Sequence, residues 1–536
     1  MLIHSLLCLF LTFLLIDTRQ IYQSTLSEWY RQPGNPGVKI RLTKKGINHL
    51  KTVGVKLLNE QIANLRGYST SFPFSQPGLE GFVSLNNVNV LQYNPPQVSV
   101  VNFLPPRYIV FGLENMDISL AGNFFGTGGP IQVGGTVDGS LLGMTVALTA
   151  EFTKNAHGMM SVQVPNCSTI IGRSHFNINP QGPMGPLVKT LEAFINDGIR
   201  QRIPTMFCKK LKHLIEDNSP KMFAKLTRTN FGEHFKGDLI ENTVMKKFIM
   251  DFVKGLYIDN RNIADPIVTY DYFETQNKGE VRYMDSNEPT PFYPKEMQTD
   301  EDSDRMLYFY GSDYIFNSLL YHAYQTNKLN IELNHHNLPA QYKSLVSTSC
   351  SSQGATSFAS SVCVGKLIPA LAKAYPNTTT SFVLIPHGLP EFSFNGDAGA
   401  IRLSSRIITY VDYKGHLKQV IVSSADGQAD INLSAQGGKL GGDLKLNRLA
   451  VRLHRSAIEI EPSAIEQLTP LAKTFIGPQL SQALHKGVPF PLQDSITFVD
   501  PKLKVHNGFI ELGTDFILNE NALRMKMQET FADMDI

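Results

Sequence analysis

The chain has 536 residues, which is more than one hydrophobic core usually supports, so we expect two domains. Its composition, 42% apolar and 18% charged, is typical of a folded globular protein and not of a disordered one. The formal net charge is only +2, which argues against DNA or RNA as a partner.

The N-terminus carries an apolar stretch from Leu6 to Ile16 that turns polar at Asp17. About 20 apolar residues are needed to cross a bilayer, and this stretch is shorter. It therefore predicts a secretory signal peptide over residues 1–18. An uncleaved anchor is the alternative, because the basic residues that usually precede a signal core are missing. We expect a secreted, extracellular protein.

Four cysteines follow the predicted signal peptide, namely Cys167, Cys208, Cys350 and Cys363. Four cysteines allow three pairings. We favour Cys167–Cys208 and Cys350–Cys363, because each pair falls within one expected domain. Metal ligation is the competing hypothesis, but the chain has no C-x-x-C spacing of the zinc type. The sequence predicts no metal site and no cofactor.

Three sequons for N-glycosylation begin at Asn166, Asn377 and Asn432. They are typical of a secreted glycoprotein. The middle residue of the first sequon is Cys167, a predicted disulfide cysteine, which disfavours a glycan at Asn166.

The first half of the chain changes its hydrophobic period twice. Residues 43–65 repeat apolar side chains at helical spacing and predict a long amphipathic helix with a basic outer face. Residues 80–165 alternate apolar and polar positions and predict an antiparallel meander with one apolar face. A second helical stretch runs from Leu187 to Ile215, and Pro204 should kink it.

An acidic, proline-containing segment at 285–305 has no apolar period and predicts a solvated linker. A similar order of hydrophobic patterns then repeats, with several alternating strands, a helix at about 462–486 and a closing strand. The predicted domains are therefore residues 30–284 and 306–518, with a tail at 519–536. The tail could dock on the body or stay loose, and both alternatives remain open.

An amphipathic helix against a strongly curved sheet leaves apolar volume between the two layers. A lined cavity and an ordinary packed core have the same periodicity, so the pattern alone favours the packed core. The candidate cavity walls are the apolar faces of the helices at 43–65 and 462–486. Their residues are Ile47, Leu50, Leu57, Leu58, Ile465, Leu468, Leu471 and Phe475.

Several segments together resemble one known family. The opening NPGVKIRLTKKGINHL, the segment DRMLYFYGSDYIFNSLLYHAYQTNKLNIEL at 304–333, and the segment GVPFPLQDSITFVDPKLKVHNGFIELGTDF near the C-terminus occur in that family's order. The family contains the bactericidal/permeability-increasing protein, the lipopolysaccharide-binding protein, and the cholesteryl ester and phospholipid transfer proteins. The resemblance runs from about Asn35 to Leu518.

The resemblance implies an α+β fold shaped as an elongated boomerang. Each of its two domains would be a highly twisted antiparallel β-barrel with long amphipathic helices, joined by a central sheet. It also implies a disulfide between Cys167 and Cys208, apolar tubular lipid pockets and no catalysis. We accordingly expect a monomeric carrier of phospholipid or neutral lipid that touches membrane or lipoprotein surfaces transiently.

One feature departs from the lipopolysaccharide-binding members, which carry basic loops at the N-terminal tip. Residues 67–150 contain one basic residue, Arg107, and no lysine. Clustered phosphates require Lys or Arg donors, so endotoxin capture at this tip is disfavoured. The segment NPPQVSVVNFLPPRY is expected at the tip, either as an apolar membrane-touching loop or as a buried turn.

Two alternatives to a lipid carrier are consistent with the same fold or the same compartment. A pattern-recognition protein of the same fold would read bacterial envelopes through its surface, and the lysine-free tip argues against it. A secreted lipid hydrolase would need a nucleophile and base, but the chain has no G-x-S-x-G, H-E-x-x-H or P-loop motif. His335-His336 reads as a solvated turn, since adjacent residues point to opposite sides of a strand.

Overall fold

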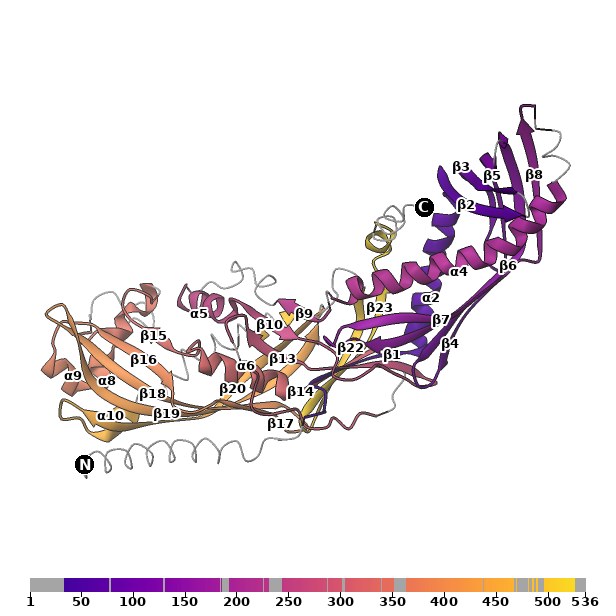
Figure 1. Ribbon diagram of the computed structural model, residues 1–536. Coiled ribbons are helices and arrows are strands. Elements are labelled where there is room, and N and C mark those ends of the chain that lie inside the picture. The colour runs from indigo at the N-terminus through magenta and orange to yellow at the C-terminus, as the bar shows by residue number, and fades with distance from the viewer. Residues whose placement is uncertain are drawn as a thin grey trace, which may run out of the picture.

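The fold is that of a computed structural model (Figure 1). It describes residues 33–525 apart from internal gaps at 77–78, 129–130, 184, 186–191, 225, 231–242, 287, 301–303, 339, 351–362, 437, 467–468, 470–480, 482–483, 486–487 and 490–495. The molecule is elongated and bent, with one curved sheet in each arm and another where the arms meet. The predicted α+β class and the two-domain layout around a central sheet are confirmed.

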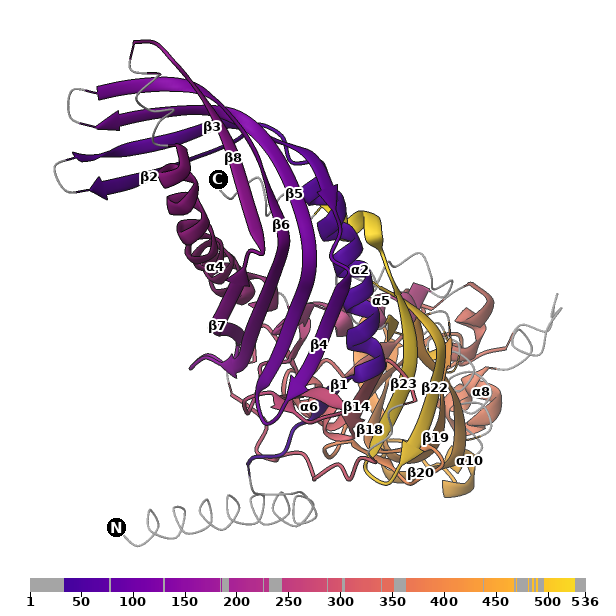
Figure 2. The same ribbon diagram turned by 90° about the vertical axis from the view of Figure 1, so that its right-hand side faces the viewer.

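The N-terminal arm is a seven-stranded antiparallel sheet in the order β2-β3-β5-β6-β7, with β4 paired to β5 and β8 to β6. Its strands are β2 (Tyr68–Gln76), β3 (Leu79–Asn94), β4 (Val98–Leu104), β5 (Tyr108–Gly128), β6 (Ile131–Lys154), β7 (Met160–Ile170) and β8 (Arg173–Gln181). Twist accumulates along such long strands, and the sheet curls strongly (Figure 2). Closure into a barrel stays a prediction.

Two long helices accompany this sheet, α2 (Lys44–Ala63) and α4 (Glu192–Ala224). The first confirms the predicted helix at 43–65. It begins where the Thr43 hydroxyl accepts a hydrogen bond from the Gly46 amide, which satisfies a donor of the first turn. The second helix extends beyond the predicted end and continues through Pro204 and Pro220.

The central sheet joins strands that are far apart in the chain, in the order β11-β12-β1-β14-β23-β22. Its strands are β1 (Val38–Thr43), β11 (Ile267–Val268), β12 (Tyr272–Asn277), β14 (Leu307–Ser312), β22 (Ile496–His506) and β23 (Phe509–Leu518). Strand β1 leads into α2 of the N-terminal arm, whereas β14, β22 and β23 come from the C-terminal half. Each arm is therefore anchored in one shared sheet.

The C-terminal arm has a second seven-stranded sheet in the order β15-β16-β18-β19-β20-β21, with β17 paired to β18. Its strands are β15 (Ile331–Leu333), β16 (Thr380–Pro386), β17 (Glu391–Phe394), β18 (Gly399–Tyr413), β19 (His416–Gln436), β20 (Lys439–Ser456) and β21 (Val488–Pro489). The helices of this half are α6 (Tyr314–Gln325), the 3-10 turn η3 (Ala340–Val346), α8 (Val364–Leu367), α9 (Pro369–Ala374) and α10 (Pro462–Glu466).

A small sheet, β13-β10-β9, lies beside α6 near the junction of the arms. Its elements are β9 (Arg228–Asn230), β10 (Leu256–Asp259) and β13 (Glu280–Tyr283), and α5 (Thr243–Val253) precedes β10. Buried Val281 and Tyr283 of β13 share a core cluster with Ala323 of α6. This cluster joins the end of the first half of the chain to the start of the second.

The predicted solvated linker at 285–305 is wrong for its middle part. Thr290, Phe292 and Met297 are almost fully buried. The Thr290 hydroxyl lies 2.8 Å from the Tyr314 hydroxyl, and Met297 packs in a cluster with three aromatic side chains of the central sheet. The segment is rich in proline and acidic residues, and its few apolar side chains have no regular period. The sequence therefore gives no signal that they attach the segment to the body.

Both predicted disulfides are present, Cys167–Cys208 with Cα atoms 5.6 Å apart and Cys350–Cys363 with Cα atoms 5.5 Å apart. The first part of the tail docks on α2. Lys56 contacts Glu520 at 2.7 Å, and Arg524 contacts Glu60 at 2.9 Å. Among the described residues, no helix is long and apolar enough to cross a membrane.

Candidate functional site

The inner face of the N-terminal sheet is apolar over most of its length. Alternate residues of β5, β6 and β8 turn to this face, as the period of a strand requires. The buried members form one cluster: Met116, Val137, Leu141, Met144, Val146, Ile171, Phe176 and Ile178. Ile203 and Leu211 of α4 pack against this cluster, so the helix supplies the opposite wall.

Covalent and polar contacts hold α4 along the edge of the sheet. Cys208 of the helix is bonded to Cys167 of β7. The Asn196 side chain accepts a hydrogen bond from the Phe176 amide and donates one to the Phe176 carbonyl, both at 2.7 Å. Farther along, the Ser219 hydroxyl accepts from the Val162 amide at 3.1 Å. The helix is thereby fixed at three points while its apolar side chains face the sheet.

Six apolar or aromatic side chains next to this cluster stay only partly buried. They are Leu85, Tyr93, Leu113, Ile118, Leu120 and Phe124. In a filled core such side chains would be in close contact on all sides. They remain partly accessible to solvent, so the neighbouring side chains do not cover them completely.

One polar group lies among these side chains. The Tyr93 hydroxyl of β3 is 2.6 Å from the Asn59 side-chain oxygen of α2. Burial raises the pKa of the Tyr93 hydroxyl, so the group stays a neutral donor. The contact ties α2 to the sheet and places a phenol at the border of the apolar face.

The predicted pocket residues on α2 occupy a different place. Ile47 is buried in a cluster with Val101, Phe103, Ile109 and Val268. Leu50 is partly buried against the same cluster. These two side chains therefore pack at the base of the arm, between the curved sheet and the central sheet. Their contact with lipid stays a prediction.

The other two α2 candidates lie farther along the helix. Leu57 is 1% exposed, and Leu58 is half-buried. Neither belongs to the cluster that joins the inner face of the sheet to α4. Their place in a pocket wall also stays a prediction.

In the C-terminal arm, Ile465 of α10 is 1% exposed and packs with Val364, Ile368, Leu371 and Val451. This well-filled cluster lies at the end of the arm away from the central sheet. Leu468, Leu471 and Phe475 lie outside the described residues, as does much of the predicted helix at 462–486.

A second apolar cluster of this arm lies closer to the central sheet. Phe392, Phe394, Ile431 and Ile510 are buried there, and half-buried Phe316, Leu433 and Leu503 pack against them. The two ends of the arm therefore differ in how completely their apolar side chains are buried.

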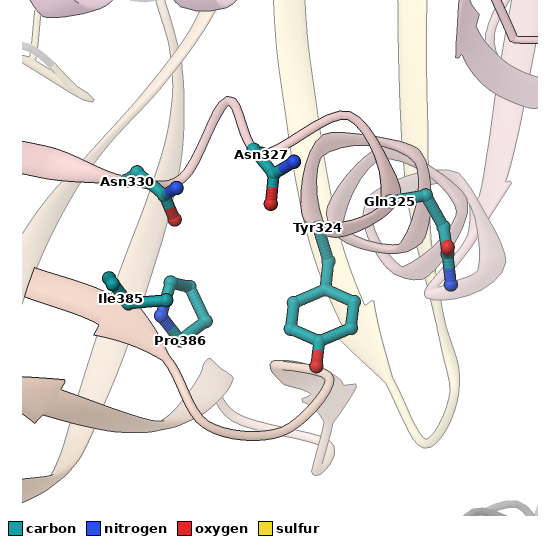
Figure 3. A pocket seen from close by; sticks show the side chains of 6 residues that line it. All are labelled: Tyr324, Gln325, Asn327, Asn330, Ile385 and Pro386. Carbon is teal, nitrogen blue, oxygen red and sulfur yellow. The ribbon is translucent and has the colours of Figure 1, made fainter.

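A pocket of about 250 Å³ opens beside the C-terminal end of α6 (Figure 3). Figure 3 shows Ile385 and Pro386 on one side and Tyr324 on the other. Gln325, Asn327 and Asn330 complete its wall. Polar side chains dominate this wall, so it does not fit an acyl chain.

The predicted tip is misplaced. The segment NPPQVSVVNFLPPRY, predicted at the tip, includes strand β4 and the turn at 105–107, and both lie at the base of the arm. The Val268 amide of the central sheet donates a hydrogen bond to the Pro106 carbonyl there. Arg107, the one basic residue of 67–150, lies 3.8 Å from Asp265 there. The free end of the sheet instead carries Phe82 and Phe125, which are 59% and 44% exposed. Both residues lie at the end of β5 that is farthest from the base, since Phe82 pairs with Thr127 and Phe125 pairs with Gly134.

No group of three metal-binding side chains occurs among the residues that the structure describes. His335 and His336 lie in a turn, with ring centroids 6.1 Å apart. The three sequon asparagines, Asn166, Asn377 and Asn432, are all exposed. Their glycosylation stays a prediction.

Comparison with protein families identifies both halves of the chain. The N-terminal domain model of the LBP / BPI / CETP family matches residues 45–217, and the C-terminal domain model matches residues 251–518. The chain belongs to this family. The family resemblance of the sequence segments is therefore confirmed.

The family relatives are distant but align over nearly the full chain. Lipopolysaccharide-binding protein of Bos taurus is 21% identical over 497 residues, with 90% of this chain and 93% of the relative covered. Phospholipid transfer protein of Homo sapiens is 23% identical over 497 residues, with 90% of each covered. A crystal structure of lipopolysaccharide binding protein aligns with 90% of this chain and 99% of its own, at 18% identity and a TM-score of 0.48.

The α4 wall was missed as a candidate site. The apolar period of 187–215 predicts this helix, but it does not indicate that the helix covers the inner face of the sheet. The alternation of Ile118, Leu120 and Phe124 along β5 was a usable signal. It identifies an apolar face, although it does not tell which helix covers that face.

Proposed function

We propose that this protein binds and transfers lipid, and that acyl chains occupy the space between the inner face of the N-terminal sheet and α4. The observation that carries the proposal is the set of six partly buried side chains on that face. A lipid chain would complete their contacts. The names of the family relatives, which include a phospholipid transfer protein, support the same class of cargo.

The physical basis of such transfer is desolvation. Each CH₂ group removed from water contributes roughly 0.8 kcal/mol, so a diacyl lipid leaves a membrane slowly unless an apolar surface receives it. The sheet and helix offer that surface without any covalent step. We infer a non-catalytic carrier, secreted and monomeric, which meets membrane or lipoprotein surfaces transiently.

Phospholipid or neutral lipid is the cargo that the charges favour. Lipopolysaccharide presents clustered phosphates, which require several Lys or Arg donors. Arg107 lies at the base of the arm beside Asp265 and Glu151, and the rest of 67–150 has no cation. Lipopolysaccharide binding is the second candidate, favoured by the names of relatives such as that of Bos taurus.

Filling the proposed space tests the function. Ile118→Trp and Leu120→Trp enlarge two half-buried side chains on the inner face of β5. We expect each variant to slow the transfer of fluorescent phospholipid between neutral vesicles by about tenfold, because the added ring occupies the volume of several methylenes. Leu142→Trp is the matched control, since Leu142 is 40% exposed and Leu141, its neighbour on β6, is the residue that packs inward.

Equal transfer by all three variants would contradict the proposed location. Failure of the parent protein to move any lipid class would contradict the function itself. Binding of lipopolysaccharide at physiological salt, lost in the filled variants, would favour the second candidate instead. Thermal unfolding of each variant separates loss of function from loss of fold.

A further inference from the structure

The small pocket at the end of α6 carries polar side chains that form no hydrogen bonds within the protein. Its volume is about 250 Å³, and Tyr324, Asn327 and Asn330 line it together with Ile385 and Pro386. Figure 3 shows the first three side chains around one open space, with Ile385 and Pro386 across from Tyr324. Within the described part of the chain, the Tyr324 hydroxyl and both asparagine amides have no hydrogen-bond partner. Three polar groups therefore converge on a space that the protein leaves unfilled.

Backbone hydrogen bonds fix the loop that carries the two asparagines. The Asn327 amide donates to the Tyr324 carbonyl at 3.2 Å, and the Lys328 amide donates to the Ala323 carbonyl at 2.9 Å. Asn327 has a φ of 57°, a left-handed conformation that asparagine adopts more readily than most residues. The Asn330 amide then donates to the Asn327 carbonyl at 3.2 Å. The polar wall is therefore formed without a ligand, which lowers the cost of binding one.

The opposite wall of the pocket belongs to the C-terminal sheet. Ile331 of β15 directly follows Asn330 in the chain and pairs with Leu384 of β16. This pairing brings Asn330 beside Ile385, the next residue of β16. Pro386 is buried at the end of the same strand. The pocket thus lies between the end of a helix and the edge of a sheet, and both walls are held by regular structure.

The chemistry of the wall favours a neutral ligand. None of the lining residues carries a charge. Lys328 of the same loop is engaged elsewhere, since its ammonium donates to the Asp251 carbonyl at 3.3 Å and lies 4.7 Å from the centroid of the Tyr283 ring. Phosphate and sulfate groups require Lys or Arg donors, and a quaternary ammonium requires an aromatic cage. Side-chain amides and a phenol instead match hydroxyl groups, both as donors and as acceptors.

The size of the pocket suits a single sugar ring. Pockets for drug-sized ligands have volumes of about 300–1,000 Å³, so a pocket of about 250 Å³ takes a smaller molecule. A pyranose ring presents hydroxyl groups along its rim and C–H groups on its two faces. The amides and the phenol hydroxyl can bind the rim, while the rings of Tyr324 and Pro386 offer apolar surface to the faces.

An apolar strip of α6 leads from the pocket toward the central sheet. Tyr324 follows Leu320 and Phe316 at a spacing of four residues, which places the three side chains on one face of the helix. Leu320 and Phe316 are half-buried and pack against the apolar cluster that contains Phe392. The helix therefore connects the polar pocket directly to an apolar surface.

The sheet shows the same order of polar and apolar positions. Pro386 lies directly opposite Ser405 of β18, and Leu403 and Ile401 follow on the same face because side chains alternate along a strand. Ile401 packs against the cluster that contains Phe392. Leu403, between the pocket and this cluster, is 39% exposed. An acyl chain along this strip would cover a large apolar side chain that the protein leaves accessible.

We propose that the C-terminal arm binds a neutral glycolipid. Its sugar ring occupies the pocket at Tyr324, Asn327 and Asn330, and an acyl chain lies along the strip that includes Leu403. The proposal rests on the proposed lipid-carrier function and names a cargo class for the second arm. A neutral sugar gives the three polar side chains their hydrogen-bond partners, which a phosphocholine head group does not.

The test measures the transfer of fluorescent lipids between neutral vesicles by the full chain. The probes are monoglucosyl and monogalactosyl diacylglycerol, compared with phosphatidylcholine that has the same acyl chains. Y324F/N330L removes the hydroxyl and one amide and keeps the size of both side chains. We expect this variant to slow the transfer of at least one glycolipid about tenfold and that of phosphatidylcholine less than about twofold, because only the sugar loses hydrogen bonds.

A matched control makes the same two changes outside the pocket. Y270F/N102L alters an exposed tyrosine and an exposed asparagine of the N-terminal half. This variant should transfer all three lipids as the parent does. Thermal unfolding of both variants checks that they are folded. Should Y324F/N330L unfold, Y324F alone provides the same comparison, with an expected slowing of glycolipid transfer of about threefold.

Several results would overturn the proposal. A parent protein that transfers phosphatidylcholine but neither glycolipid contradicts the glycolipid site and leaves the proposed function intact, whereas a parent that moves no lipid contradicts both. Equal slowing of all three lipids by Y324F/N330L, or unchanged glycolipid transfer, contradicts the role of the pocket. Calorimetry with methyl β-glucoside and methyl β-galactoside separates the two sources of a sugar. Binding of a free glycoside by a parent that transfers no glycolipid would assign the pocket to soluble sugars instead.

Discussion

Arg41 and Glu274 form a buried ion pair in the middle of the central sheet, with 2.8 Å between Nη2 and Oε2. The two residues are directly opposed on β1 and β12 and are 2% and 4% exposed. Arg41 also donates to the Asp300 carbonyl at 2.6 Å and to the Thr299 hydroxyl at 3.1 Å. One guanidinium thus connects the first strand, the central sheet and the segment between the two halves.

Removing one partner of this pair should destabilise the protein strongly. Arg41→Met leaves the Glu274 carboxylate buried without its cation, which typically costs about 3–5 kcal/mol. The double variant R41M/E274L should recover part of that loss, because both charges are then gone. Urea unfolding of the two single variants and the double variant measures the coupling. A double variant as unstable as the sum of both singles would contradict the account.

Acid should weaken a second buried network. Glu280 is fully buried, and its carboxylate lies 2.9 Å from the His322 ring and 2.5 Å from the Lys278 ammonium. Burial alone would raise the pKa of Glu280, but hydrogen bonds from His322 and Lys278 outweigh burial and lower this pKa to about 2. The lowered pKa means that the stabilisation is present above the ordinary value of 4.5 and is lost as the pH falls toward 2.

Glu280→Gln tests this network. The parent protein should exceed the variant in unfolding free energy by about 3 kcal/mol at pH 7, since buried His322 and half-buried Lys278 lose the Glu280 carboxylate. The difference should shrink at pH 3. Glu459→Gln, at an exposed carboxylate of the C-terminal arm, is the control and should show little difference at either pH. A difference for E280Q that does not change with pH would contradict the assignment.

Asp313 should have the opposite pH dependence. Burial raises the pKa of this carboxyl to about 6, although the Ser312 hydroxyl donates to it at 3.2 Å. A raised pKa means that the protein loses stability as the pH rises through 6. Asp313→Asn removes this loss. The unfolding free energy of the variant, relative to that of the parent, should therefore be higher at pH 7.5 than at pH 4.5. Urea unfolding at pH 4.5 and at pH 7.5 measures this change. Asp397→Asn, at an exposed carboxylate, is the control and should show no such gain in unfolding free energy.

Glycans should occupy two of the three sequons. Asn377 and Asn432 are exposed, and nothing in their sequons is engaged in a disulfide. The sequon of Asn166 contains Cys167, which is bonded to Cys208. Intact mass of protein from a secreting host, before and after enzymatic deglycosylation, should show loss of one glycan in Asn377→Gln and one in Asn432→Gln. A mass loss in Asn166→Gln would contradict the prediction.

Much of the fold could be predicted from local patterns. The helical period of 43–65 and the alternation over 80–165 are signals within one element, and both elements formed as predicted. The strand order of the central sheet could not be derived from such signals, because β1 pairs with β12 and β14 more than 200 residues away. Those pairings depend on contacts such as the Arg41–Glu274 ion pair, which produce no hydrophobic period in the sequence.

The candidate site was only partly predictable for a related reason. Periodicity tells which face of a helix or strand is apolar, but not which apolar face meets which. Ile47 and Leu57 have the right pattern for a pocket wall, yet Ile47 packs at the base of the arm. The helix that faces the inner sheet is α4, which is attached through Cys208 and Asn196. The segment predicted to form the tip lies at the base for a similar reason. Strand β3 pairs with residues 117–128 of β5 and β4 pairs with residues 108–114, so the chain runs along β5 toward the base and the turn after β4 lies there.

The most direct test of the account is mass spectrometry of lipid extracted from protein purified from a secreting host without detergent. The account predicts phospholipid or neutral lipid in the parent protein and in Leu142→Trp, at roughly one equivalent or more per chain. It predicts clearly less lipid in the variant that carries both Ile118→Trp and Leu120→Trp. Lipid-free parent protein, or equal lipid content in the filled variant, would contradict the central claim that the space between the N-terminal sheet and α4 carries lipid.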